Sequence, residues 1–233
     1  MGAKGFAEEI GVDYKFVNSS FSDIIADLSG TDPETGEKKE IKGDIIETGF
    51  TVLSYRKEFV DFSKPVFPTQ VWLVTGSENS LSPITPEETT AKDIKKVKDL
   101  IEGKSVLGIR KTCLDPGLYN LSETGAKPIF FNGSVNDLAP AVINYRADAT
   151  LLDVADTLIA LEKWPGKIKV IGPVGHVQNM AAAFRKDSPD LRKAYNDYFE
   201  KICKNGEYQK IVKKYYPMVF NYYPEFFKKC LNK

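Results

Sequence analysis

The chain has 233 residues, of which 42% are hydrophobic and 27% are charged, a composition typical of a folded globular protein. Its 32 Lys and Arg residues balance 32 Asp and Glu residues, so its net charge of zero gives no reason to expect a nucleic acid or an anionic membrane as the main partner. No apolar stretch approaches the ~20 residues of a membrane-spanning helix, and the N-terminal residues lack the apolar core of a signal peptide.

Apolar residues recur at helical and at strand spacing in turn, which predicts an α/β protein with mostly parallel sheets. In the first part of the chain we expect a short helix ending at Ile10, a strand at 14–17, a helix capped by Ser20 with Phe21, Ile24, Ile25 and Leu28 on its apolar face, an exposed loop at 31–42, and strands at 44–48 and 71–74. After the polar segment 76–90 we expect helices at 93–101, 114–122, 135–145 and 154–162, strands at 105–109, 128–131, 147–152 and 168–171, and a helical tail over 190–203, 207–215 and 224–231.

Cysteine and histidine are too few and too scattered for a common metal site or catalytic triad. Cys113, Cys203 and Cys230 show no Cys-x-x-Cys spacing, and His176 is the only histidine. A triad would depend on His176 alone, and no Gly-x-Ser-x-Gly motif occurs. In an exported protein Cys203 could pair with Cys230, which would leave one thiol free. We therefore predict no cofactor, no metal ligand and no catalytic residue.

Three segments close to the ends of predicted strands carry the candidate site, because ligands of α/β proteins bind outside the carboxyl ends of strands. They are GFTVLSYRKEFVDFS at 49–63, GKSVLGIRKTC at 103–113 and ATLLD at 149–153. In this order and spacing, and together with FSDIIADL at 21–28 and the stretch 184–216, they resemble the amino-acid-binding (family 3) extracellular solute-binding proteins of ABC transporters. The resemblance runs from about residue 7 to residue 216.

This resemblance implies a two-lobed, periplasmic-binding-protein-like fold of type II. Each lobe is expected to be a mixed, mostly parallel sheet flanked by helices, and the chain is expected to cross between the lobes at two hinges. The expected first lobe combines residues 1–66 with 179–233, which include a C-terminal helical extension, and the second lobe with its hinges is 67–178.

The resemblance also implies which first-lobe residues bind the ligand. Arg56 falls on the arginine that binds the ligand's α-carboxylate, a role suited to a planar guanidinium that makes two parallel hydrogen bonds. Thr51 corresponds to a hydroxyl on the same carboxylate, and the carbonyl of Gly49 to an acceptor for the ligand's ammonium group. From the residues alone, Arg56 could equally be a surface arginine beside acidic neighbours.

In the second lobe, Asp153 matches the acidic partner of the α-ammonium group, although a strand-terminal Asp often only caps the next helix. Thr112 and Cys113 are expected to begin a helix, whose free N–H groups favour an anion, and ordinary N-capping is the alternative. Phe21, from the first lobe, aligns with a side chain that stacks on the ligand, or else belongs to the core. We expect specificity to depend on Phe21, Phe50 and Lys111, among others.

Two departures from the family pattern stand out. Lys111 occupies a position that is usually Gly in the family, so its cation could favour an anionic ligand side chain. The chain also starts within what corresponds to the family's first helix, so the first lobe is expected to lack its opening strand and to leave a sheet edge exposed.

The resulting expectation is a non-catalytic, periplasmic or extracellular solute-binding protein that captures an amino acid or a similar small zwitterion for ABC-type transport. Its expected partners are that ligand and an ABC permease, and it is expected to be a monomer that binds no nucleic acid. The alternatives are a ligand-sensing domain of the same fold, a degenerate member that no longer binds, or a cyclohexadienyl-dehydratase-like enzyme. For the enzyme, Glu47 is the nearest candidate acid by sequence, but it is expected inside a strand.

Overall fold

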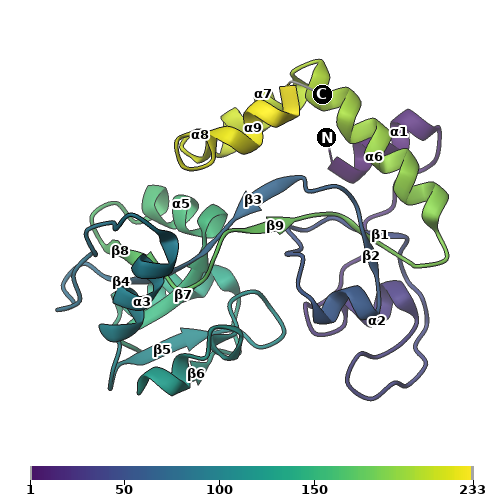
Figure 1. Ribbon diagram of the computed structural model, residues 1–233. Coiled ribbons are helices and arrows are strands. Elements are labelled where there is room, and N and C mark those ends of the chain that lie inside the picture. Colours follow the sequence, from purple (N-terminus) through teal and green to yellow (C-terminus); the bar gives the residue numbers. More distant parts are fainter. Residues whose placement is uncertain (1, 232–233) are drawn as a thin grey trace. The chain divides into compact units, whose positions relative to one another are not determined.

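The computed structural model describes residues 2–231 and shows an α/β chain (Figure 1). Contacts divide the chain into two compact units: unit 1 contains Met1–Pro68 and Gln178–Lys233, and unit 2 contains Thr69–Val177. The chain therefore passes from one unit to the other twice, along the strands β3 (Phe67–Thr69) and β9 (Gln178–Met180), which pair with each other.

Unit 1 holds a three-stranded sheet in which the middle strand comes from the second chain segment. The order is β1–β10–β2, with β1 at Ile45–Ile46, β10 at Ala183–Phe184 and β2 at Asp61–Phe62. β10 is antiparallel to both neighbours, with Ala183 opposite Ile46 on one side and Phe62 on the other. β1 and β2 therefore run in the same direction, and the returning chain inserts between them.

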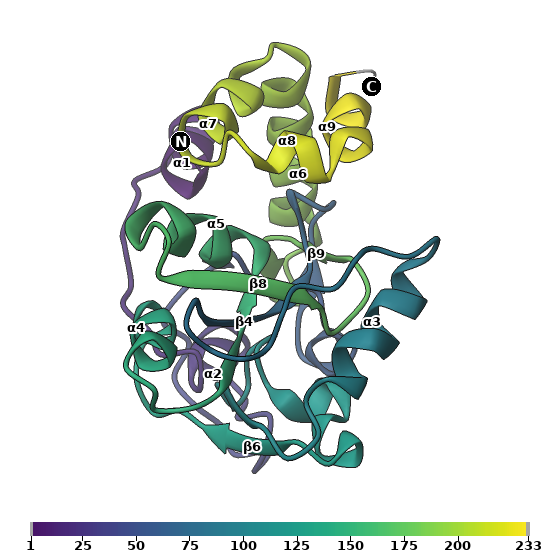
Figure 2. The same cartoon turned by 90° about the vertical axis from the view of Figure 1, so that its left-hand side faces the viewer.

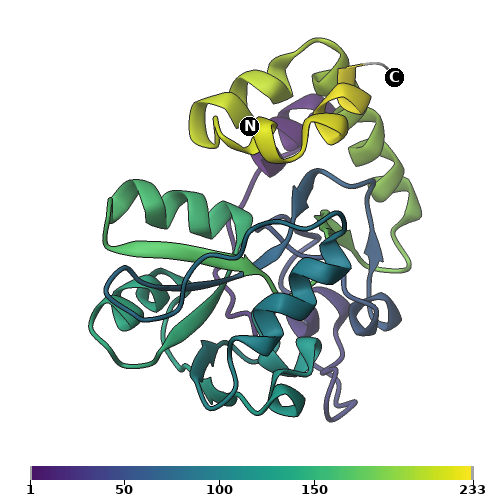
Figure 3. The ribbon, with the colours of Figure 1, turned by 60° about the vertical axis from the view of Figure 1, so that its left-hand side comes forward.

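Helices surround this sheet. They are α1 (Gly2–Ile10), α2 (Ile24–Ser29), the 3-10 helix η1 (Tyr55–Glu58), α6 (Pro189–Lys204), α7 (Glu207–Tyr215), α8 (Val219–Tyr222) and α9 (Pro224–Leu231). Helix α1 lies among the C-terminal helices (Figure 3) and packs on α6 through Phe6, whose ring meets Tyr195 edge-on at 5.2 Å. A small apolar core joins α2 to the sheet through Ile25, Leu28, Ile46, Phe50, Val60 and Ala183.

Two predictions for the start of unit 1 are wrong. Residues 14–17 form no strand, because no described residue donates to or accepts from their backbone, and a strand needs a neighbour. Helix α2 begins at Ile24, since the Ser20 hydroxyl accepts from the Asp23 amide in a separate turn. Phe21 therefore lies before the helix and is 42% exposed rather than part of its apolar face.

Unit 2 is built on a five-stranded sheet in the order β6–β5–β7–β4–β8 (Figure 2). The strands are β4 (Val71–Gly76), β5 (Ser105–Gly108), β6 (Lys127–Phe130), β7 (Ala149–Asp153) and β8 (Ile168–Pro173). β5 is parallel to β6 and β7, whereas β4 is antiparallel to β7 and β8. As in unit 1, the strand that enters from the other unit runs against the rest. The predicted α/β fold with mixed sheets is confirmed, while the strand pairings of unit 1 are antiparallel.

The helices of unit 2 are α3 (Thr90–Asp99), α4 (Leu138–Ile143) and α5 (Val154–Lys163), with 3-10 turns η2 (Pro116–Tyr119), η3 (Leu121–Thr124) and η4 (Val135–Asp137). Strand β4 is buried along its whole length, which places it at the centre of the core. The predicted helix at 114–122 is replaced by η2 and η3, because Asn120 between them adopts a left-handed conformation with φ 52°.

The longest described helix, α6 of unit 1, has 16 residues and carries many charges. None of the helices described in 2–231 has the length and hydrophobicity of a bilayer-spanning segment.

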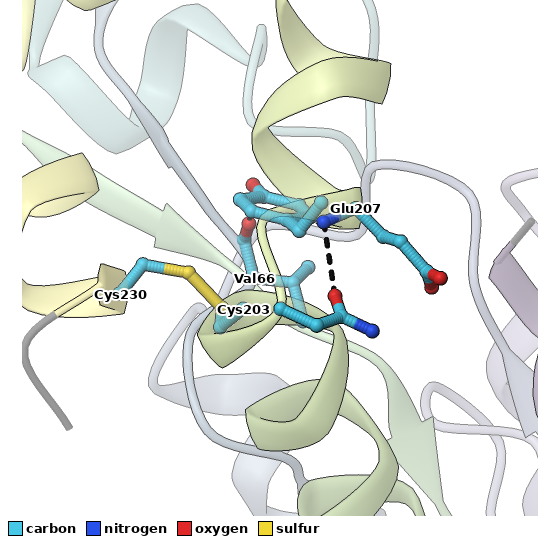
Figure 4. The surroundings of a disulfide bond; sticks show 6 residues. Val66, Cys203, Glu207 and Cys230 are labelled. Carbon is cyan, nitrogen blue, oxygen red and sulfur yellow. Dashed lines mark hydrogen bonds between the residues drawn. A yellow bond between two sulfur atoms is a disulfide. The ribbon is translucent and has the colours of Figure 1, made fainter.

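A disulfide fastens the C-terminal helix of unit 1. Cys203 of α6 bonds to Cys230 of α9, and their Cα atoms are 5.3 Å apart. Figure 4 shows the bond beside Val66, whose carbonyl accepts from the Tyr208 hydroxyl. The buried ring of Phe227, also on α9, contacts the rings of Phe67, Tyr208, Phe220 and Phe226. The C-terminal helices are therefore held by a cross-link and by an aromatic cluster.

Replacing both bridged cysteines, as Cys203→Ser/Cys230→Ser, should lower the free energy of unfolding by about 3–4 kcal/mol, because the bridge closes a loop across a separation of 27 residues. Urea unfolding measures this change. A thiol reductant should destabilise the wild-type chain by a similar amount and leave the double variant unaffected. Equal stability of the oxidised wild type and the variant would contradict the prediction.

Candidate functional site

Arg56 is the largest fully buried side chain, with 2% of it exposed. It lies in η1, and its Nη1 donates to the carbonyl of Thr51 at 2.8 Å. Its Nε donates to the Tyr55 hydroxyl at 3.1 Å, and its guanidinium carbon lies 3.9 Å from the centre of the Phe50 ring. These three contacts fix the position and orientation of the guanidinium within unit 1.

The Thr51 carbonyl accepts a hydrogen bond from Arg56, and the Thr51 hydroxyl is buried. Only 1% of Thr51 is exposed, and its Oγ1 has no hydrogen-bond partner among the described residues. A buried hydroxyl without a partner costs about 1–3 kcal/mol, which a ligand's oxygen would offset. Gly49, two residues earlier, has φ 61°, a left-handed conformation that glycine adopts without strain.

Of the expected unit 1 residues, the structure brings together Phe50, Thr51 and Arg56, with Gly49 at the start of the same turn. Phe50 is 1% exposed, and its ring lies against the Arg56 guanidinium and the Phe62 ring. Phe50 therefore belongs to the support of Arg56. Phe21 lies outside this group, in the exposed turn before α2.

Asp153 ends β7 and caps α5 in unit 2. Its Oδ1 accepts from the Asp156 amide at 2.9 Å, and it is 5% exposed. Burial raises the pKa of Asp153, opposed by hydrogen bonds from the amides of Asp156 and Ala155. The carboxylate thus sits at a helix N-terminus, where the backbone favours negative charge, and capping accounts for part of its role.

Asp156, one turn into α5, is a second, half-buried carboxyl group that the sequence did not indicate. Burial, and then the neighbouring Asp153 carboxylate, raise the pKa of Asp156 to about 7. The signal available in the sequence was an Asp three residues after a capping Asp, which by itself indicates only an acidic first turn. Because these two carboxyl groups are neighbours, ionisation of one makes ionisation of the other less favourable.

Lys111, Thr112 and Cys113 follow β5, the parallel neighbour of β7, so they lie toward the same edge of the sheet as Asp153. The expected helix N-terminus is wrong. The Thr112 hydroxyl donates to the Ile109 carbonyl and accepts from the Leu114 amide, closing a turn, and η2 begins only at Pro116. Cys113 is a buried free cysteine whose carbonyl accepts from the Tyr119 hydroxyl. Thr112 and Cys113 therefore do not form a helix N-terminus that could bind an anion.

Lys111 is exposed and has φ 63°, so it holds a left-handed backbone conformation with an L side chain. Such a conformation costs about 1–2 kcal/mol for most residues and is routine only for glycine. The backbone therefore keeps glycine-like geometry at this position even though the residue is lysine.

Glu47, the candidate acid of the enzyme alternative, has a structural role. Its carboxyl accepts from the Tyr195 hydroxyl of α6 at 2.5 Å and from the Ala3 amide of α1, and burial raises the pKa of Glu47. These contacts tie α1 to the rest of unit 1. Within residues 2–231, no group of three or more His, Cys, Asp or Glu side chains is arranged to hold a metal ion.

Comparison with known families identifies the chain. The model of the bacterial extracellular solute-binding proteins, family 3, matches residues 2–218. The chain belongs to this family. Its fold is the two-unit periplasmic-binding-protein fold, as the similarity to solved structures of amino-acid-binding proteins also shows.

Three relatives illustrate the range of the family. A mutant of ArgBP from T. maritima is 25% identical with a TM-score of 0.74, covering 92% of this chain and 82% of that one. The ancestral amino-acid-binding protein AncCDT-1, described as a precursor of cyclohexadienyl dehydratase, is 25% identical with a TM-score of 0.71 over 92% and 82% of the chains. A membrane-bound lytic murein transglycosylase F of Desulfosudis oleivorans is 25% identical over 93% of this chain, which spans only 43% of that protein.

The strain at Lys111 predicts an unusual order of stability. Lys111→Gly should be more stable than Lys111→Ala by about 1 kcal/mol, because both lose the side chain but only glycine relieves the left-handed strain. Urea unfolding of the two variants measures the difference. The same pair at Lys95, in the middle of α3, serves as the control, and there alanine should be the more stable by about 1 kcal/mol. The prediction fails if alanine is also preferred at Lys111.

Asp156→Asn should raise stability at pH 8 by about 1–3 kcal/mol and change it little at pH 4. Because the pKa of Asp156 is raised to about 7 in the folded chain, the folded state binds more protons than the unfolded state between about pH 4 and 7. Wild-type stability therefore falls as pH rises through this window. Denaturation from pH 4 to 8 tests this, with Asp99→Asn on the exposed side of α3 as the control. A uniform offset across the range would contradict it.

Proposed function

We propose that the chain is a non-catalytic solute-binding protein that captures an amino acid or a similar small zwitterion for ABC-type transport, outside the cytoplasmic membrane. In this proposal, Arg56 and the Thr51 hydroxyl bind the ligand's carboxylate, the Gly49 carbonyl accepts from its ammonium group, and Asp153 of unit 2 is the anionic partner of that ammonium. The expected partner for delivery is an ABC permease.

The observation that carries this proposal is the buried guanidinium of Arg56 next to a buried hydroxyl without a partner. A buried, oriented guanidinium suits a carboxylate, which can accept two parallel charge-assisted hydrogen bonds from it. Asp153 supports the opposite end, because a buried zwitterion needs one cation and one anion. An ancestral arginine-binding protein with arginine bound is among the similar structures, which supports an amino-acid ligand.

Titration calorimetry against the twenty amino acids tests the proposal, with protein that has been unfolded and refolded to remove any bound ligand. Binding of one amino acid or a few is expected. Absence of heat with all of them would overturn the proposal. Mass spectrometry of the denatured, freshly purified protein can identify a ligand that is retained.

Arg56→Ala should weaken binding of the identified ligand by about 2–5 kcal/mol, because it removes the partner of a desolvated carboxylate. Arg56→Lys keeps the charge but loses the planar pair of donors, so it should bind at an intermediate level. Arg192→Ala serves as the control, since Arg192 pairs with Asp61 at the surface of the same unit. Calorimetry measures all three, and equal affinity of Arg56→Ala and the wild type would rule out this role.

A ligand-sensing domain is the second candidate, and the transglycosylase relative favours it because this chain matches only part of that longer protein. Titration with soluble murein fragments separates the two functions: binding of these fragments but of no amino acid would favour sensing. The dehydratase alternative is tested by following prephenate or arogenate in the ultraviolet. Glu47, its candidate acid, is engaged with α1 and α6.

A further inference from the structure

The side chain of Arg56 must be held still to bind a carboxylate well. A free arginine side chain samples many rotamers, and its planar donor set gives strong paired hydrogen bonds only in one orientation. In this chain the orientation comes from the segment Phe50–Arg56. That segment is itself anchored, since the Val52 amide donates to the Asn179 carbonyl at 2.8 Å and the Ala181 amide donates to the Phe50 carbonyl at 3.1 Å.

Three contacts within unit 1 fix the guanidinium in different directions. The Thr51 carbonyl accepts a hydrogen bond from Nη1, and the Phe50 ring covers one face of the guanidinium. The Tyr55 hydroxyl accepts a hydrogen bond from Nε. The first contact is main chain and the second is a core ring. Only the third depends on a single side-chain atom that can be removed without opening a cavity in the core.

Tyr55 is well placed for this task. It directly precedes Arg56 in η1, is half-buried, and its ring centre lies 5.6 Å from the guanidinium carbon. Its hydroxyl accepts the Nε proton, so it holds the guanidinium at its root, where a small rotation would swing both Nη atoms. A hydrogen bond to a charged group stabilises more than one between neutral groups.

We propose that Tyr55 is a positioning residue: its hydroxyl orients the Arg56 guanidinium and so sets the affinity for ligands that bear a carboxylate. Phe50 acts with it from the face of the guanidinium. The inference rests on the proposed function of Arg56 and assigns a residue that neither the motif nor the family resemblance indicated.

The test is Tyr55→Phe, which removes one oxygen and keeps the ring. The amino acid that the wild type binds should bind about tenfold more weakly, whereas the same ligand as its carboxamide should bind the variant and the wild type equally. A merely structural role would lower both affinities together. Tyr14→Phe, at an exposed tyrosine of the same unit, is the matched control and should change neither.

A second comparison isolates the contact to Arg56. In an Arg56→Lys background, Tyr55→Phe should have no further effect on amino-acid binding, because lysine has no Nε–H donor at that position. Thermal denaturation should show that all variants fold. Unchanged amino-acid affinity in Tyr55→Phe, or an equal loss in the lysine background, would overturn the inference and leave the proposed function standing. A wild-type chain that binds no amino acid would overturn both.

Discussion

The burial of one guanidinium is the constraint on which unit 1 depends. Removing a charge from water is costly unless polar partners replace the solvent, and in this chain the partners close to Arg56 are a carbonyl, a phenol and an aromatic face. They hold the cation in place. The Thr51 hydroxyl in the same segment has no hydrogen-bond partner among the described residues, which supports the carboxylate binding proposed above.

Unit 2 withdraws acidic side chains from water, whereas unit 1 buries a cation. Asp153 is buried and Asp156 is half-buried at the start of α5, and their partial removal from water makes the ionised forms unfavourable. Backbone amides at the N-terminus of α5 donate hydrogen bonds to Asp153. Burial, and then the neighbouring Asp153 carboxylate, raise the pKa of Asp156. A cation brought to this turn would relieve both carboxyl groups. Each unit, taken by itself, therefore has a group of the charge that the proposed function assigns to it.

Much of the fold could be predicted from local sequence, and the failures have identifiable causes. Local patterns were sufficient to predict the helices α3, α5 and α6 and the strand β4. A helix buried on one face has amphipathic spacing, and a strand buried on both faces is a continuous apolar run. Residues 14–17 have a strand's alternation but no neighbour to pair with, which local sequence does not encode. The site residues came from family resemblance and remain predictions. Tyr55 and Asp156 were missed because their roles depend on what surrounds them in three dimensions.

Lys111 shows that a backbone conformation suited to glycine can carry a lysine side chain. The backbone there has the left-handed conformation that glycine prefers, so the turn after β5 keeps a glycine-like course while it carries a lysine. Strain of this kind persists only where the surrounding structure over-determines the backbone. The Thr112 hydroxyl does so, bonded to Ile109 before the turn and Leu114 after it. The turn therefore presents an exposed cation on a glycine-like backbone, and we propose that ligand selectivity depends on its charge.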